Sequence, residues 1–184
     1  MTSSTTPGLS RFNASEEPAA TAALHEVCSS PAWGSKILAQ RPYASAALLL
    51  AASDAAMAEL TPADLEEAMA GHPPIGRPKP GDPTSAREQR GMAGASEELK
   101  AELLELNLAY QEKFGHVFLI CATGATAEFM LDRIRTRIEN GPEQEREIVR
   151  TELGKINRIR LTRLVEEPAE AQEAQEAAEE GSKA

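Results

Sequence analysis

A proline-rich segment at residues 72–83 most strongly limits what this chain can fold into. The segment reads HPPIGRPKPGDP and holds five prolines and two glycines in twelve residues. Because proline lacks a backbone N–H and fixes φ, the segment cannot form a regular helix or a central strand. We predict a long, stiffened loop, and such rigidity in a long loop is more typical of a functional site than of a simple connection.

The sequence on both sides of this loop favours helices. There are 32 alanines and 18 leucines against four valines and eight isoleucines, and only seven residues are aromatic. This balance favours α-helices over sheets and excludes a sandwich or a barrel. We predict an all-α single domain of about seven to eight helices, with one short extended segment, HVFLICA, at residues 116–122. Periodicity and capping signals place helices at residues 12–30, 32–39, 45–58, 61–70, 96–114, 126–139 and 143–165, and a short one from residue 85.

The two ends of the chain differ in composition from the middle. Residues 1–11 are rich in Ser, Thr, Pro and Gly and predict a flexible leader. Residues 166–184 hold seven Glu and one Lys, and predict an acidic disordered tail. This tail accounts for −6 of the net charge of −10, so residues 12–165 form a mildly acidic folded domain. Such a domain has no basic face suited to phosphate backbones, and we expect no nucleic-acid partner.

The chain also has no feature of a membrane or secreted protein. No apolar stretch approaches the ~20 residues that a membrane span requires, so no membrane partner is expected. The N-terminus lacks the basic start and apolar region of a secretion signal. The two cysteines, Cys28 and Cys121, allow at most one disulfide. We therefore expect a reducing, cytoplasmic location.

His72 is the first candidate for chemistry, because it stands directly after a predicted helix and at the start of the loop. A helix C-terminus favours the protonated imidazole, which suits a proton donor near neutral pH. The alternative is a surface histidine that caps carbonyls. No metal-type spacing links it to His25 or His116, and no CxxC, HExxH, GxGxxG, P-loop or nucleophile elbow occurs. We expect no metal and no nucleotide cofactor.

Two further segments are candidates for binding. In SAREQ at residues 85–89, Ser85 and Glu88 have the spacing of a helix capping box, and the Gln89 amide can donate and accept. In the apolar run at residues 118–122, an extended chain without a partner strand leaves backbone groups that a flat, amide-rich ligand can satisfy. The alternative for this run is a core segment. Cys121 has no base near it in sequence, so we do not expect a nucleophile there.

Taken together, four motifs resemble one family. They occur in the family's order and spacing between residues 12 and 164, and read HPPIG at 72–76, SAREQ at 85–89, YQEKFGHVFLICATG at 110–124 and EL-x-KI-x-RIRL-x-RL at 152–164. The family is that of the 2-oxo-4-hydroxy-4-carboxy-5-ureidoimidazoline (OHCU) decarboxylases. The resemblance implies an all-α, commonly dimeric enzyme of urate degradation that converts OHCU to (S)-allantoin with release of CO₂. It also implies that no metal or organic cofactor takes part.

The resemblance further implies roles for residues of this sequence. His72 matches the proton donor, and Glu88 is the second expected catalytic residue. The expected substrate-binding residues are Pro73, Ser85, Ala86, Arg87, Glu88, Gln89, Leu119, Ile120, Cys121, Ala122 and Thr123. Many members carry Arg or Lys where this chain has Thr123, and that cation can face the substrate carboxylate; here Arg87 or helix amides near Ser85 are the candidates to replace it. Two alternatives stay open: a catalytically silent member that binds a ligand or acts as a scaffold, and a decarboxylase or hydrolase of a related cyclic ureide.

Overall fold

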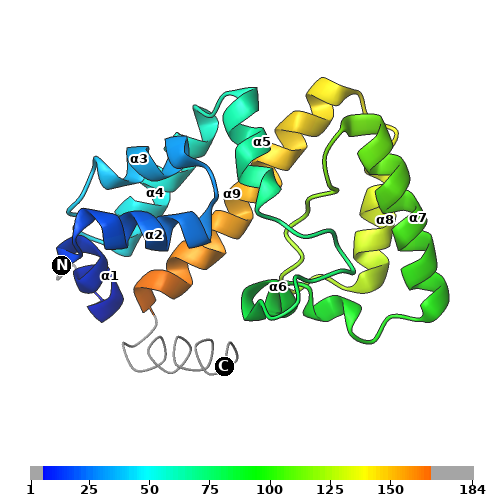
Figure 1. Cartoon of the computed structure of the whole chain (residues 1–184), viewed down its shortest axis with the longest axis horizontal. Coiled ribbons are helices and arrows are strands. Elements are labelled where there is room, and N and C mark those ends of the chain that lie inside the picture. Colours follow the sequence, from blue (N-terminus) through cyan, green and yellow to red (C-terminus); the bar gives the residue numbers. More distant parts are fainter. Residues whose placement is uncertain (1–5, 167–184) are drawn as a thin grey trace. The chain divides into compact units, whose positions relative to one another are not determined.

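The computed structural model describes residues 6–166, and this part of the chain is helical, with no strand (Figure 1). The all-α prediction is confirmed. The elements are α1 (Pro7–Ala14), α2 (Glu17–Val27), α3 (Pro31–Leu38), α4 (Ala46–Ala58), α5 (Pro62–Ala70), α6 (Pro83–Glu88), the 3-10 turn η1 (Arg90–Met92), α7 (Glu97–Phe114), α8 (Ala127–Arg137) and α9 (Pro142–Glu166).

The helices group into two compact units. Among the described residues, unit 1 comprises residues 6–60 and 157–166, and unit 2 comprises residues 61–156. The helices α1 to α4 and the end of α9 belong to unit 1, whereas α5 to α8 and the first part of α9 belong to unit 2. All of the predicted site residues lie in unit 2, so this unit positions the site.

Unit 1 is built around Trp33 of α3, which is fully buried. The helix α3 packs against α2 and α4, and the Trp33 indole N–H donates a hydrogen bond of 3.3 Å to the hydroxyl of Ser53 on α4. Other fully buried side chains of this core are Leu9, Leu24, Ile37 and Leu49. Burial of large apolar side chains therefore stabilises the packing of the helices in this unit.

The N-terminal boundary differs from the prediction of a flexible leader over residues 1–11. Thr6 caps α1, Pro7 is the first residue of that helix, and Leu9 is buried in the core. The prediction is therefore wrong for residues 7–11, and residues 1–5 lie outside the described range. The predicted helix over 12–30 is also divided, because α1 ends at Ala14 and α2 begins at Glu17. Of the predicted tail, Glu166 ends α9, and residues 167–184 lie outside the described range.

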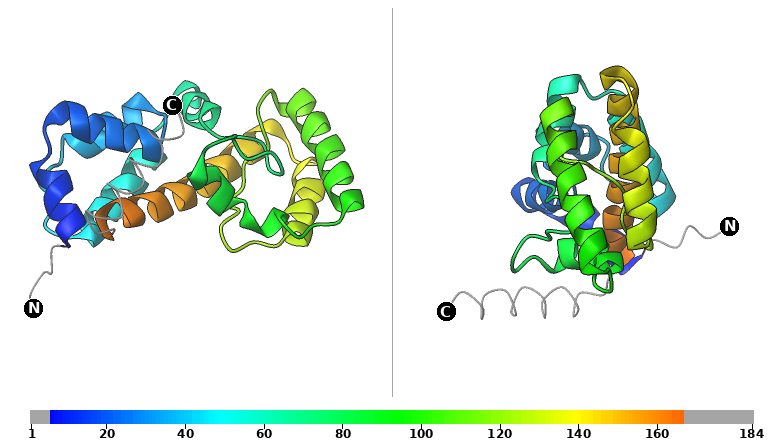
Figure 2. Two further views of the ribbon diagram at one scale, coloured as in Figure 1. Left: turned by 60° about the horizontal axis from the view of Figure 1, so that its bottom comes forward. Right: turned by 90° about the vertical axis from the view of Figure 1, so that its right-hand side faces the viewer.

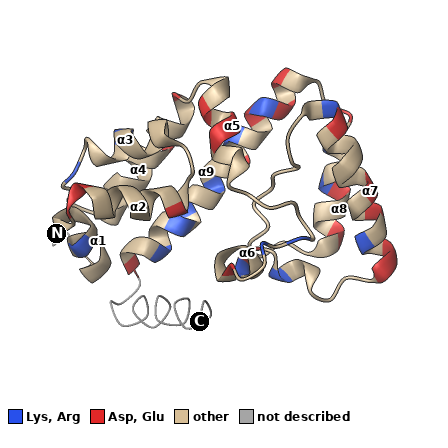
Figure 3. Ribbon diagram, viewed as in Figure 1, with Lys and Arg blue, Asp and Glu red and all other residues tan. Residues whose placement is uncertain are grey.

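Unit 2 is organised by the long helix α7, whose apolar stripe forms one side of the core. The hydroxyl of Ser96 caps its start, and Gly115 ends it in the left-handed region at φ 79°, a conformation that glycine adopts at no steric cost. Leu103 and Tyr110 are buried on its inner face. The helix α8 lies beside α7 in Figures 1 and 2. Acidic and basic residues are interspersed along the outer face of α7 (Figure 3), as the sequence pattern predicts for a solvated face.

The loop between α5 and α6 contains no regular element, as its prolines predict. The run at residues 117–122 likewise belongs to no helix or strand, and it inserts Phe118, Ile120 and Ala122 into the core of unit 2. Within residues 6–166, none of the helices is both long and apolar enough to cross a membrane.

Candidate active site

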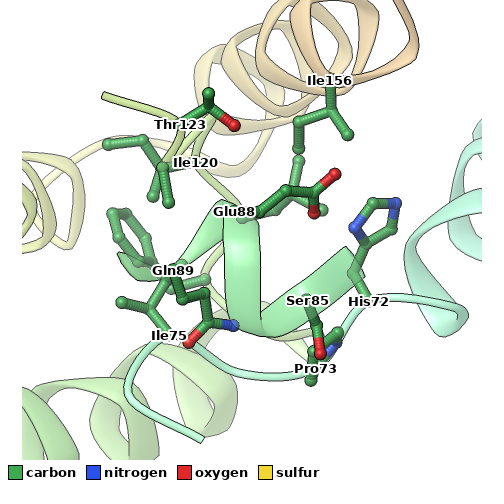
Figure 4. A pocket seen from close by; sticks show the side chains of 12 residues that line it. His72, Pro73, Ile75, Ser85, Glu88, Gln89, Ile120, Thr123 and Ile156 are labelled. Atoms are coloured by element: carbon green, nitrogen blue, oxygen red, sulfur yellow. The ribbon is translucent and has the colours of Figure 1, made fainter. Parts of the chain in front are cut away.

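One pocket of unit 2 brings together most of the predicted site residues (Figure 4). It is lined by four segments of the sequence: the start of the proline-rich loop, the helix α6 with the residue after it, the apolar run with Thr123, and Ile156 of α9. From the predicted set it is lined by His72, Pro73, Ser85, Glu88, Gln89, Leu119, Ile120, Ala122 and Thr123. The loop, α6 and the run therefore meet at one place.

His72 and Glu88 provide the ionisable groups of this pocket. His72 follows the C-terminus of α5, and its backbone N–H donates to the carbonyl of Met69 at 2.9 Å. Glu88 is the last residue of α6 and is buried, with 9% of its surface exposed. The His72 imidazole and the Glu88 carboxylate point toward one another in Figure 4. An imidazole beside a buried carboxylate can hold a proton and deliver it to a ligand in the same pocket.

The helix α6 begins earlier than the sequence pattern predicts. Its N-cap is Asp82, whose carboxylate accepts from the N–H groups of Thr84 at 2.9 Å and Ser85 at 3.3 Å. The predicted capping box of Ser85 and Glu88 is therefore wrong: Ser85 lies inside the helix and Glu88 at its end. The Asp82 carboxylate already accepts from these N–H groups. They are therefore not free to bind the substrate carboxylate in place of the cation that many family members are expected to carry at the position of Thr123.

Two residues expected to bind substrate use their polar atoms to hold the loop. The Ser85 hydroxyl accepts from the N–H of Lys79 at 3.0 Å and lies 3.3 Å from the Asp82 carbonyl, to which it donates. The Gln89 amide accepts from the N–H of Gly76 at 2.9 Å and donates to the carbonyl of Pro74 at 3.2 Å. Gly76 has a φ of 85°, so the turn that presents this N–H requires glycine. Both side chains thus hold the loop against α6.

Three predicted binding residues lie outside the pocket lining. Ala86 is exposed and Arg87 is half-buried on other faces of α6. Cys121 contributes instead to an adjoining groove of about 840 Å³, which shares Ile120 and Thr123 with the pocket and is also lined by Arg133 and Lys155. Burial raises the pKa of the Cys121 thiol, which disfavours the reactive thiolate and agrees with the expectation that this cysteine is not a nucleophile.

Several contacts of the site were missed by the sequence reasoning. Ile75, Phe118 and Ile156 complete the lining of the pocket. Phe118 belongs to the candidate run and Ile75 stands two residues after Pro73, whereas no residue of the motif at 152–164, which holds Ile156, was expected in the site. Asn107 was not singled out, although its amide donates to the Ile75 carbonyl at 3.2 Å and so holds the loop from the α7 side. The available signal was a polar residue on the buried face of α7.

The apolar run is fixed by side chains of two helices. The Arg137 guanidinium donates to the carbonyl of Leu119 at 2.8 Å. The carboxylate of Glu152 accepts from the backbone N–H of Cys121 at 2.9 Å. These bonds attach the run to α8 and to α9.

Arg137 is itself held in a buried network with Glu145 and Tyr110. Its Nε donates to the Glu145 carboxylate at 2.8 Å, the Tyr110 hydroxyl donates to the same oxygen, and Asn140 donates to the other at 2.9 Å. Burial alone raises the pKa of Glu145, but the hydrogen bonds from Arg137, Tyr110 and Asn140 outweigh it and hold this pKa below its usual value. Burial and the hydrogen bond to Glu145 raise the pKa of Tyr110 well above its usual range. The network is therefore ionised at Arg137 and Glu145 and neutral at Tyr110 near pH 7.

Among residues 6–166, no group of three or more His, Cys, Asp or Glu side chains is arranged to hold a metal ion.

Comparison with protein families gives a match to the model described as OHCU decarboxylase over residues 13–162. Two curated relatives are similar to the chain. The uric acid degradation bifunctional protein TTL of Arabidopsis thaliana is 31% identical over 143 residues, which cover 74% of this chain and 44% of the relative. The 2-oxo-4-hydroxy-4-carboxy-5-ureidoimidazoline decarboxylase of Amia calva is 41% identical over 61 residues, which cover 33% of this chain and 35% of the relative. The chain thus spans less than half the length of either curated relative.

Solved structures have the same fold. A crystal structure of OHCU decarboxylase in the presence of (S)-allantoin is similar to this chain with a TM-score of 0.70 and 28% identity, over 78% of this chain and 96% of that one. A crystal structure of (S)-allantoin synthase gives a TM-score of 0.64 at 19% identity, over 85% of this chain and 54% of that one, which shows the fold alone.

Proposed function

Because the chain belongs to the OHCU decarboxylase family, we propose that it catalyses the decarboxylation of OHCU to (S)-allantoin in urate degradation, without a metal or organic cofactor. The observation that carries this proposal is the meeting of His72 and Glu88 in one pocket with the apolar run. These are the residues that the motif match assigns to catalysis, and four segments of the chain line the pocket.

The proposed reaction breaks the bond between the ring carbon and its carboxylate. CO₂ leaves, and the electron pair of this bond forms a double bond to the neighbouring ring carbon, which bears the ureido group, while the electron pair of the ring C=N bond moves onto the nitrogen, which takes up a proton. The protonated His72 imidazole then delivers its proton to one face of the ureido-bearing carbon, the hydroxyl on the former carboxylate carbon loses its proton and becomes the carbonyl of allantoin, and water returns a proton to the imidazole. A positioned acid of this kind contributes about 10²–10⁴-fold to the rate.

Glu88 lies at the same end of the pocket as His72 and orients the imidazole or the ureido N–H groups of the substrate. Within residues 119–123, the backbone groups that are not already bonded to Arg137 or Glu152 supply hydrogen bonds to the ring, including donors to the ring atoms on which negative charge develops. A ligand held between the loop and the run presents one face to His72, which sets the handedness of the product. Pro73, Ser85 and Gln89 keep the loop that carries His72 in place.

The decisive experiment measures the concentration of freshly prepared OHCU over time, once with the purified protein and once with buffer alone. We expect faster loss of OHCU with the protein, and a circular dichroism signal of one allantoin enantiomer. Decay at the buffer rate would contradict the proposal and favour the catalytically silent alternative. Loss of a related cyclic ureide, with OHCU unaffected, would favour the other alternative, a decarboxylase or hydrolase of that ureide.

We also propose that the protein acts as a homodimer in the cytoplasm. The dimer is supported by the family resemblance, and the location by two cysteines that are both unpaired. Light scattering after size-exclusion chromatography tests the dimer, and a mass of about 20 kDa, that of one chain, would contradict it. Cell fractionation tests the location.

A further inference from the structure

The apolar run at residues 118–122 and Thr123 directly after it contribute to the pocket, although the run has no neighbouring strand among the described residues. We propose that Glu152 of α9, together with Arg137 of α8, is a positioning residue that fixes this run for substrate binding. This inference rests on the proposed function, because it takes the run as the segment whose backbone contacts the substrate.

The two anchors contact the run in the pattern of a strand pair. In an extended chain, the backbone groups of residues i and i+2 point to the same edge. The carbonyl of Leu119 and the N–H of Cys121 are two residues apart, so a neighbouring strand would pair with both of them. Here Arg137 donates to the carbonyl at 2.8 Å and Glu152 accepts from the N–H at 2.9 Å. Side chains of two helices take the place of the missing strand on this edge.

The opposite edge is then left for the ligand. The N–H and C=O groups of Ile120 alternate with those of its neighbours, and so belong to the edge that the two anchors do not use. Ile120 and Ala122 line the pocket with His72 and Glu88, whereas Cys121 lines only the adjoining groove, which Ile120 also borders. Fixing one edge therefore also fixes the orientation in which the other edge meets a bound substrate.

Each anchor is held by further contacts of its own. The Glu152 side chain is 14% exposed, and its second oxygen pairs with Lys155 one turn later on α9 at 2.6 Å. Arg137 is held by Glu145 and lies over the Phe118 ring, 4.6 Å from its centre. Hydrogen bonds with an ionised partner are stronger than neutral ones. Two such bonds from fixed helices can hold a backbone segment within the narrow geometric limits that catalysis requires.

Glu152 is the better residue to test, because removal of Arg137 would leave Glu145 buried without its partner and risk unfolding. The chain offers a matched control for Glu152 on the same helix. Glu147 pairs with Arg150 with the same three-residue spacing, but its side chain is 67% exposed, and within residues 6–166 it is Glu152 whose carboxylate bonds the run at Cys121. The control carries the same charge change and the same loss of an ion pair.

The experiment compares Glu152→Ala, Glu152→Gln and Glu147→Ala in the OHCU assay. Because a shift of about 1 Å in a positioned group costs about 10²-fold, we expect Glu152→Ala to lower kcat/KM by up to about that factor. We expect Glu152→Gln to recover most of this loss, since its amide oxygen still accepts from Cys121, and Glu147→Ala to resemble the wild type. Wild-type kcat/KM in Glu152→Ala would overturn the proposal, and so would an equal loss in Glu152→Gln.

Amide hydrogen exchange in residues 118–123 gives a readout that does not depend on activity. We expect faster exchange in this run for Glu152→Ala at unchanged thermal stability, and wild-type exchange for Glu147→Ala. If the wild type does not accelerate OHCU loss, the proposed function fails, while exchange still decides whether Glu152 anchors the run. Unchanged exchange in Glu152→Ala would overturn the anchoring itself.

Discussion

The side-chain oxygen of Gln89 accepts a hydrogen bond of 2.9 Å from the backbone N–H of Gly76. The same amide donates to the Pro74 carbonyl, so one side chain after α6 spans the turn of the proline-rich loop. Gln89 is buried, with 6% of its surface exposed. A residue that sequence motifs assign to the substrate therefore also fixes the loop that begins with His72.

Gln89→Leu is expected to loosen this loop. The substitution leaves the Gly76 N–H and the Pro74 carbonyl without their partner. Both hydrogen bonds are part-buried, and one such bond contributes about 0.5–1.5 kcal/mol. We expect a lower free energy of unfolding by about that amount in urea titrations, and a lower kcat for OHCU. Gln144→Leu, at an exposed position of α9, is the control, and a wild-type kcat in Gln89→Leu would contradict the assignment.

His72→Ala and Glu88→Ala are each expected to leave the fold intact and to lower the rate of enantioselective allantoin formation by about 10²–10⁴-fold. The far-UV circular dichroism spectrum reports the fold, and the circular dichroism of the product reports the handedness. His25→Ala, at an exposed position of α2, serves as the control. Formation of one enantiomer at the wild-type rate by both variants would refute the site assignment.

Thr123→Lys is expected to lower KM for OHCU. Thr123 is exposed and lines the pocket. The family resemblance implies that many members carry Arg or Lys at this position. An added ammonium attracts the substrate carboxylate, and salt screens this attraction. Initial rates at low and high ionic strength measure the effect. Thr136→Lys adds the same charge to α8 outside the pocket lining and should leave KM unchanged; equal effects of both variants would indicate a general charge effect.

The buried Arg137–Glu145 pair is expected to be essential for stability. Arg137 is 5% exposed and Glu145 is fully buried. Glu145→Gln removes the negative charge and leaves the guanidinium buried without it, which costs about 3–5 kcal/mol. The matched control is Glu102→Gln, which breaks an exposed pair with Arg135 and should cost about 1 kcal/mol or less. Urea unfolding of both variants checks this, and equal losses would contradict it.

The lowered pKa of Glu145 also predicts that the protein loses stability in acid. Its pKa in the folded state is below the usual value of 4.5, so the unfolded chain binds a proton at a higher pH than the folded one. The contribution of Glu145 to stability is fully present above pH 4.5 and decreases as the pH falls through the lower folded-state pKa. Urea midpoints of the wild type and Glu145→Gln between pH 7 and pH 3 should therefore converge toward the acid end. A constant difference across this range would refute the linkage.

The helices were predictable where a polar cap or a glycine marks their ends. Ser96 and Gly115 bound α7 at the predicted positions, and Thr61 caps α5. Two of the boundary errors, at the starts of α1 and α6, have one physical cause. Pro7 and Pro83 each occupy the first position of a helix after a capping side chain, Thr6 or Asp82. Proline suits this position because its missing N–H would be unpaired there in any case, whereas the prediction treated both prolines as parts of loops.

The site was predictable only in its local motifs. His72, Glu88 and Gln89 fall in short segments whose residue types already suggest proton transfer and hydrogen bonding. Asn107 and Glu152, by contrast, act on the loop and the run from 32 and 31 residues away along the chain. Such contacts depend on how the helices of unit 2 pack, and neither periodicity nor spacing within one helix encodes that.

The attachment of the run to α8 and α9 has a consequence for how this protein can change over evolution. No point mutation deletes a backbone carbonyl, and only a substitution by proline deletes a backbone N–H. Recognition of a ligand by the main chain of the run is therefore insensitive to most substitutions within the run. Heritable variation in that recognition has to arise at a distance, through the side chains that aim the backbone. Arg137 and Glu152 are therefore the places where we expect selection to tune ligand preference without altering any residue that touches the ligand.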